Sequence, residues 1–307
     1  MPTTPRHRSG PSTSARRSVA AIVIALAVLM TACSSSDDSA LEKRPFTVHL
    51  PPGYRKGKAV PLLVVLHGYA FTGKVQSLYF HLAAVTDAHG MMWVAPDGTK
   101  NDEGKQFWNA TDACCAPAGS TVDDSAYLAA VIDNIRSRYD VDPRRIYVMG
   151  HSNGGFMAYR MACDHADVVA AVVSLEGATY ADPSKCSPSE PVAALEVHGD
   201  ADTVIRYEGG RMNGSDPNSA SYPSAADTTL SWARLDHCKE TPDDPAPATR
   251  AIVSGLPSAT VTSYGTGCDR GGHAELWTQP GGNHVPDINQ EFTEQAVSFM
   301  LAHPKPK

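Results

Sequence analysis

The sequence predicts an α/β fold in which helices flank a mainly parallel central sheet. Short apolar runs alternate with stretches of helical periodicity along the chain, as they do in repeated βαβ units. The runs contain few polar residues, which is typical of strands that are buried on both faces. The expected strands are 62–66, 91–95, 145–149, 171–175, 192–197 and 274–279, with an edge strand over 46–50.

The segments between these strands have two kinds of pattern. In some of them apolar residues recur at spacings of three and four, which predicts amphipathic helices. Others are polar and irregular, and loops of such length are usually functional or disordered. In parallel sheets these loops lie at the carboxyl edge, where ligands bind. The expected helices are 78–88, 126–139 (with Asp123 or Asp124 as N-cap) and 288–301, and the irregular segments are 99–121 and 209–227.

Composition and charge exclude some classes of protein. The chain has 307 residues, of which 42% are hydrophobic and 19% charged, as in ordinary globular domains. Its net charge is -7, and no basic cluster follows its first residues. Nucleic acid is therefore not expected as a partner, because such proteins neutralise phosphates with clustered basic side chains.

The N-terminus has the pattern of an export signal. Arg16 and Arg17 belong to a positive region, and the apolar run that follows, 19–30, is too short for a membrane span of about 20 residues. The run ends in Met30-Thr31-Ala32-Cys33, which resembles a bacterial lipobox. We therefore expect lipidation of Cys33 and anchoring to the outer face of the cell membrane, with plain secretion as the alternative.

Cleavage at this point divides the chain into three parts. Residues 1–32 are the expected signal peptide, 33–43 a solvated tether, and 44–307 a single domain. The domain is expected to be a monomer.

Six cysteines follow Cys33, and an even number in an exported protein suggests disulfides. No cysteine or histidine spacing matches a zinc site, so we expect no metal. The preferred pair is Cys238 with Cys268, while free thiols remain the alternative. Cys114 and Cys115 are expected to bond elsewhere, because a bridge between neighbouring residues is strained.

A nucleophile is predicted directly after the strand 145–149. Gly150-His151-Ser152-Asn153-Gly154-Gly155 lies between this strand and a helix-compatible run. A sharp strand-to-helix turn of this kind exposes the serine hydroxyl, and glycine at 150 and 154 removes side chains that would clash. The context predicts the α/β-hydrolase fold with Ser152 as nucleophile.

A serine hydroxyl attacks only when a base removes its proton. In this fold the acid and then the histidine follow the serine along the chain. His284 comes after the strand 274–279, and Asp202 closes the strand 192–197, so we assign them as base and acid. Asp200 remains the competing acid and His273 the competing base.

The oxyanion that forms when the serine attacks a carbonyl group also needs hydrogen-bond donors. We assign the backbone N–H groups of Asn153, after the nucleophile, and of Tyr69, which follows the first buried strand. Alternatively, Tyr69 only lines the pocket. No metal or organic cofactor is implied.

The chain resembles the polyhydroxybutyrate depolymerase and feruloyl esterase group of α/β-hydrolases, in particular actinobacterial lipoprotein esterases. The resemblance runs from about Phe46 to the end of the chain. It implies a triad of Ser152, Asp202 and His284, with Asp202 at the last position of an HGxxD pattern. It further implies an ester substrate, with Trp108 and His151 as pocket residues; the alternative for Trp108 and Tyr69 is that they are packed core. The segments that carry it are PLLVVLHGY, FWNATDACC, TVDD, GHSNGG, VHGDAD, SWARLDHC and ELWTQPGGNH.

Three functions follow from these observations. The leading hypothesis is hydrolysis of carboxylic esters, feruloyl or polyhydroxybutyrate-type, through an acyl-enzyme. A serine peptidase of the prolyl-oligopeptidase type shares GxSxGG and HGxxD, but such enzymes generally need an extra N-terminal domain. A cell-surface binding protein without catalysis would not need the serine, aspartate and histidine in this order.

Overall fold

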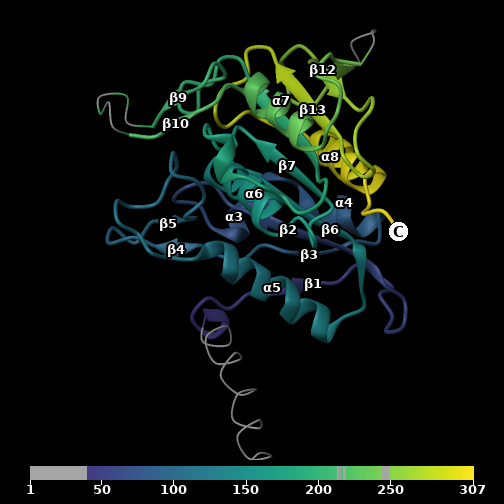
Figure 1. Ribbon diagram of the computed structural model, residues 1–307. Coiled ribbons are helices and arrows are strands. Elements are labelled where there is room, and N and C mark those ends of the chain that lie inside the picture. Colours follow the sequence, from purple (N-terminus) through teal and green to yellow (C-terminus); the bar gives the residue numbers. More distant parts are fainter. Residues whose placement is uncertain (1–39, 213, 215, 217–218, 244–248) are drawn as a thin grey trace, which may run out of the picture. The chain divides into compact units, whose positions relative to one another are not determined.

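The computed structural model describes residues 40–307 except 213, 215, 217–218 and 244–248. The expected signal peptide, Cys33 and most of the tether lie outside the described residues. A compact unit begins at Leu41 and extends to the C-terminus (Figure 1). No helix in the described part of the chain is long and apolar enough to span a membrane.

A nine-stranded sheet forms the centre of this unit, in the order β1-β3-β2-β6-β7-β8-β13-β12-β11. All neighbours from β3 to β13 are parallel, whereas β1, β12 and β11 pair antiparallel at the two edges. The predicted mainly parallel sheet is confirmed. The strands are β1 Val48–His49, β2 Val60–Leu66, β3 Met92–Val94, β6 Val141–His151, β7 Ala171–Leu175, β8 Ala193–Gly199, β11 Thr249–Arg250, β12 Ala259–Tyr264 and β13 Ala274–Gln279.

Helices pack against the sheet (Figure 1). Apolar strand residues form much of the buried core. α4 and α8 pack against each other and contact β3 and β7, respectively. α6 lies along β6 and β7 with α5 beside it, while α7 contacts β8 and β13. The β2 side chains Leu62 to Leu66 are fully buried, as a central strand requires. The helices are α3 Gly73–Tyr79, α4 Leu82–Ala88, α5 Asp124–Arg138, α6 Asn153–Asp164, α7 Ala225–Leu235 and α8 Gln290–Ala302, with one 3₁₀ turn, η1, over Pro183–Lys185.

One helix predicted from the sequence is divided between two helices in the structure. The segment 78–88 divides between α3 and α4, because His81 adopts a left-handed conformation with φ 50°. The side chain of His81 lies 3.3 Å from the carbonyl oxygen of Ile288, so a distant contact accompanies the break.

The two irregular segments contain short hairpins that the sequence did not predict. β4 Thr99–Lys100 pairs with β5 Gln106–Phe107, and β9 Gly210–Arg211 pairs with β10 Ser221–Tyr222. α7, β11 and β12 were not predicted either.

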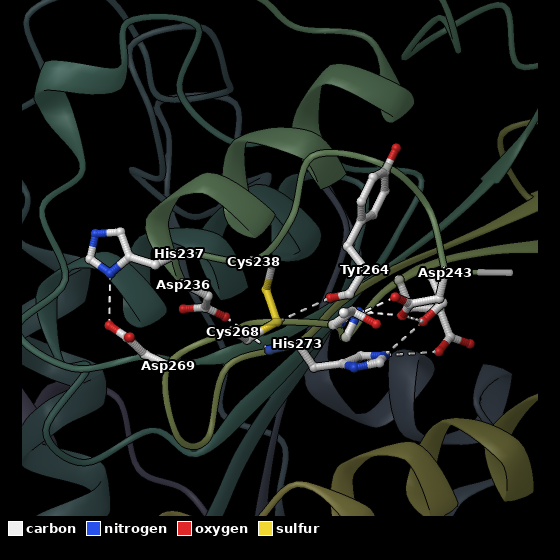
Figure 2. Close-up of a disulfide and its surroundings, with 12 residues drawn as sticks. Asp236, His237, Cys238, Asp243, Tyr264, Cys268, Asp269 and His273 are labelled. Carbon is white, nitrogen blue, oxygen red and sulfur yellow. Dashed lines mark hydrogen bonds and ion pairs between the residues drawn. A yellow bond between two sulfur atoms is a disulfide. The ribbon is translucent and has the colours of Figure 1, made fainter.

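Three disulfides lie in the described domain. One joins Cys238, after α7, to Cys268, after β12, and this is the pair that the sequence favoured. Figure 2 shows that it holds the end of α7 beside the turn that leads to β13. Cys163 pairs with Cys186.

The third disulfide joins Cys114 to Cys115. The expectation that these two would bond elsewhere is therefore wrong. The other four cysteines of the domain pair among themselves and leave no different partner for them.

Candidate active site

The turn at Ser152 joins β6 to α6 at the carboxyl edge of the sheet. Ser152 has φ 53° and ψ -120°, a backbone conformation that residues other than glycine rarely adopt. A Cβ atom at Gly150 would clash with the carbonyl group of Gly154, and one at Gly154 with that of Leu66. The turn thus requires glycine at both positions, and strain of this kind is typical of functional sites.

Ser152, His284 and Asp202 form a hydrogen-bonded chain, although they come from three distant segments. His284 Nε2 lies 2.9 Å from Ser152 Oγ, and His284 Nδ1 lies 2.7 Å from Asp202 Oδ2. The other carboxylate oxygen of Asp202 accepts the N–H groups of Val204 at 2.7 Å and Ile205 at 3.0 Å. Both oxygens of the acid are therefore held, and the imidazole faces the serine.

The two competing residues lie elsewhere. Asp200 Oδ1 accepts the N–H group of Gly281 at 2.7 Å and does not contact His284. His273 lies 3.2 Å from Glu275 Oε2 and stacks on His303, away from Ser152.

The surroundings favour an ionised acid. Burial alone would raise the pKa of Asp202. The hydrogen bond and charge of His284, with the Val204 N–H group, outweigh burial and hold this pKa below its usual value. A carboxylate at this position can stabilise an imidazolium that forms at His284.

Two backbone N–H groups adjoin the serine. Asn153 begins α6, and its side chain pairs with the backbone N–H and C=O groups of Trp108, at 2.7 and 2.9 Å. A Cβ atom added at Gly68, directly before Tyr69, would lie 3.6 Å from Ser152 Cβ, and Tyr69 lines the same cavity as Ser152. Within the described residues, the N–H groups of Asn153 and Tyr69 donate no hydrogen bond, so they are available to an oxyanion.

A cavity of about 730 Å³ opens onto Ser152 and His284. The Cys114–Cys115 disulfide, the loop 116–120 and several apolar side chains form its walls. Among the described residues, its one charged lining residue is Asp112, which is paired with Lys185 at 2.5 Å. The apolar side chains are Phe71, Val204, Met212 and Val285, with Tyr69 beside them.

The two predicted pocket residues differ. His151 lines the cavity, and its Nε2 donates to the carbonyl oxygen of His284 at 2.8 Å. The prediction that Trp108 lines the pocket is wrong, because the residue is fully buried and does not belong to the cavity wall. Its indole N–H donates to the carbonyl oxygen of His67, which holds the ring in the core.

A buried polar group that the sequence did not indicate lies behind Asp202. It contains Glu176, Glu196 and His198, of which Glu176 directly follows β7. Glu176, His198 and Asp202 place one ligand atom each within 4.8 Å of the others, a spacing that a metal ion could use. However, both ring nitrogens of His198 lie 2.8 Å from oxygen acceptors, which leaves no lone pair for a metal.

Known proteins with similar sequences include esterases. The "Feruloyl esterase B" of Piromyces equi is 29% identical over 240 residues, which cover 76% of this chain and 43% of that protein. The "Putative esterase NocK" of Nocardia uniformis subsp. tsuyamanensis is 30% identical over 169 residues, or 54% of this chain and 47% of that protein. The chain thus spans less than half the length of these relatives.

Solved structures show the same fold. The acetyl xylan esterase from Aspergillus awamori superposes with a TM-score of 0.57 over 83% of this chain and 93% of its own, at 16% identity. The model of the family described as "Putative esterase" matches residues 39–265, which is most of the chain and includes Ser152 and Asp202. The chain belongs to this esterase family.

Proposed function

We propose that the protein hydrolyses carboxylic esters, with Ser152 as nucleophile, His284 as general base and Asp202 as the acid that orients it. The observation that carries the proposal is the continuous chain of hydrogen bonds from Asp202 through His284 to Ser152. A strained nucleophile turn and two unpaired N–H groups beside it support the same chemistry.

The reaction then has two halves. Ser152 Oγ attacks the ester carbonyl carbon while His284 Nε2 takes the hydroxyl proton, and the Asn153 and Tyr69 N–H groups bind the oxyanion. The carbon–oxygen bond to the alcohol breaks, and His284 returns the proton to the leaving oxygen. Water attacks the acyl-enzyme with His284 again as base, which releases the acid and restores Ser152.

The cavity favours esters of an uncharged, largely apolar acid. No cationic side chain lines it among the described residues, so nothing there would pair with a second carboxylate on the substrate. Its size is within the range of about 300–1,000 Å³ for small-molecule pockets. Hydroxycinnamoyl esters and hydroxybutyrate oligomers both fit this description, and a relative is named as a feruloyl esterase.

We further propose that the enzyme is exported and lipid-anchored through Cys33. The charged and apolar N-terminal pattern and the disulfides of the domain support this, since disulfides persist in oxidising compartments. Cells grown with a labelled fatty acid should incorporate label into the wild-type protein and not into Cys33→Ser. Equal labelling of the two would contradict anchoring at this residue.

Matched variants test the catalytic assignment. With nitrophenyl acetate, Ser152→Ala should lower kcat at least about 10³-fold, and Asp202→Asn about 10⁴-fold. Asp200→Asn, two residues away, should stay within about twofold of wild type because Asp200 does not touch His284. Full activity of Ser152→Ala, or faster turnover of peptide nitroanilides than of esters, would contradict the proposal.

A substrate panel tests which acyl group of the ester the enzyme prefers. Methyl ferulate, hydroxybutyrate oligomers and a dicarboxylic monoester should be compared at equal concentration by their kcat/KM values. The dicarboxylic monoester is expected to be the poorest, because its free carboxylate would enter a cavity without a cation.

A further inference from the structure

The side of Asp202 that faces away from Ser152 is packed with ionisable side chains that the reaction above does not use. Glu176, Glu196 and His198 are each at most 1% exposed. Tyr159, from α6, donates its hydroxyl to Glu196 Oε2 at 2.9 Å. Such groups are costly to bury unless they are paired, so their charges must be arranged together.

His198 has the contacts of an imidazolium. Its Nδ1 lies 2.8 Å from Glu196 Oε1, and its Nε2 lies 2.8 Å from the carbonyl oxygen of Ile205. A carbonyl oxygen can only accept, so Nε2 carries a proton. Burial raises the pKa of Glu196, but its hydrogen bonds with His198 and Tyr159 favour the carboxylate, and a carboxylate requires a proton on Nδ1. Burial would lower the pKa of His198, but the neighbouring carboxyl groups and the Ile205 carbonyl raise it to about 9.

Glu176 shares a proton with Asp202, and its Oε2 also lies 3.2 Å from His198 Nε2. Its carboxyl group hydrogen-bonds Asp202, so one of the two must hold the shared proton. Burial, and then the charge of Asp202, raise the pKa of Glu176 well above its usual value, while the pKa of Asp202 is lowered. The proton therefore belongs to Glu176.

The backbone at Glu176 adopts a strained conformation. The residue has φ 56°, in the left-handed region, directly after β7. Its carboxyl oxygens also accept the N–H group of Gly199, at 3.0 and 3.1 Å. A residue other than glycine that is held in this strained conformation is typical of a functional position.

We propose that His198, as an imidazolium near neutral pH, and Glu176, which shares one proton with Asp202, are positioning residues that leave a single net negative charge behind His284. Glu196 contributes one negative charge, the pair of Glu176 and Asp202 contributes one because it holds a shared proton, and His198 contributes one positive charge. The positive charge that His284 gains during the reaction then cancels the remainder. This role, unlike the protonation states themselves, rests on the function proposed above.

The other groups that face His198 do not alter this balance. The Tyr207 ring approaches the His198 ring edge-on, with 5.8 Å between the ring centroids, and the Tyr207 hydroxyl is hydrogen-bonded to the hydroxyl of Thr278. Tyr159 is reached through Glu196, and burial raises its pKa well above the usual value, so it stays neutral. On the far side of Asp202 lies His284 itself.

The protonation state can be measured without any activity. In nitrogen-15-labelled mature protein, both ring nitrogens of His198 are expected to carry protons from pH 6 to 8, as seen in long-range proton–nitrogen spectra. His151, which is equally buried, should show one protonated nitrogen and serves as the internal control. A single protonated nitrogen on His198 at pH 7 would overturn the assignment.

Three variants test the role through the acid limb of kcat/KM against pH. His198→Gln removes the cation and should move this limb up by about one pH unit, because a charge within a few ångströms shifts titration by that much. Glu176→Gln keeps a donor to Asp202 and an acceptor for Gly199, so the limb should stay within about 0.3 unit. Asp200→Asn, an exposed charge change on the same turn, is the matched control.

The outcomes separate this inference from the proposed function. An unmoved limb in His198→Gln, or a limb that moves down by about one unit in Glu176→Gln, would overturn it even if Ser152→Ala is inactive. If Ser152→Ala is fully active, the proposed function fails, and the spectra still decide the charges. If His198→Gln does not fold, the spectra and Glu176→Gln remain as tests.

Discussion

Two histidines on opposite sides of His284 are almost equally buried but differ in charge, since the ring on one side is neutral and the ring on the other is cationic. His151, on the pocket side, is 2% exposed, and His198, behind Asp202, is 1% exposed. Burial and the charge of His284 lower the pKa of His151 to about 4, whereas carboxyl neighbours raise that of His198 to about 9. Burial is unfavourable for an imidazolium in both places, so the partners decide the charge.

The difference follows from what each ring contacts. In the described part of the chain, Nε2 of His151 meets one carbonyl oxygen and its Nδ1 has no hydrogen-bond partner. His198 has an acceptor on each nitrogen, and Glu176 and Asp202 lie within 3.6 Å of its Nε2. His284 thus lies between a neutral, apolar front and an ionic back.

The largest expected contrast is in stability. His198→Leu leaves Glu196 and Asp202 without their cation and should lower the free energy of unfolding by about 3–5 kcal/mol. His151→Leu removes one neutral hydrogen bond and should cost about 1–2 kcal/mol. Urea denaturation of both variants at pH 7 measures the difference. Equal losses would show that the back of the site is no more ionic than the front.

The pH dependence of stability should separate the same two residues. The folded-state pKa of His198, about 9, lies above its ordinary value of 6.5, so its contribution is full below pH 6.5 and disappears as pH rises to about 9. The folded-state pKa of His151, about 4, lies below 6.5, so its contribution is full above pH 6.5 and disappears as pH falls to about 4.

Each histidine therefore adds a slope of up to about 1.4 kcal/mol per pH unit, on opposite sides of pH 6.5. The His198→Gln curve should lack the alkaline slope alone, and the His151→Gln curve the acid slope alone, so subtraction from the wild-type curve isolates each contribution. Urea midpoints recorded from pH 4 to 9 provide both curves. A change on the wrong side for either variant would reverse the assigned charge states.

The front of the site was more predictable from sequence than the back. Ser152, Asp202 and His284 each follow a recognisable strand, and the carboxyl ends of parallel strands meet at one edge of a sheet. The order of these residues along the chain was therefore enough to expect them together. Glu176 also ends a strand, but no local pattern distinguishes its carboxyl group from an ordinary surface acid.

Two of the errors have the same origin, since both depend on contacts between distant segments. Trp108 was expected in the pocket, but its backbone is paired with the side chain of Asn153, 45 residues away. The break at His81 accompanies a contact with Ile288, 207 residues away. A pattern read along the chain contains spacing and polarity, whereas such contacts exist only after the sheet has formed.

The smallest expected effect comes from adding charge at the front. Val285→Asp places a carboxylate on the cavity rim, at a residue that is 48% exposed. Like His198→Gln, it changes the charge near His284 by one negative unit, but water screens it. The acid limb of kcat/KM should therefore rise by about 0.3 pH unit at low salt, with the neutral variant Val285→Asn as control.

Salt then distinguishes the two sides of His284. The Debye length falls to about 3 Å at 1 M salt, so the shift caused by Val285→Asp should disappear there. The shift caused by His198→Gln should persist, because buried charges are screened much less. If both shifts vanish at high salt, solvent reaches the back of the site as freely as the front, and the charges behind Asp202 are not protected from screening.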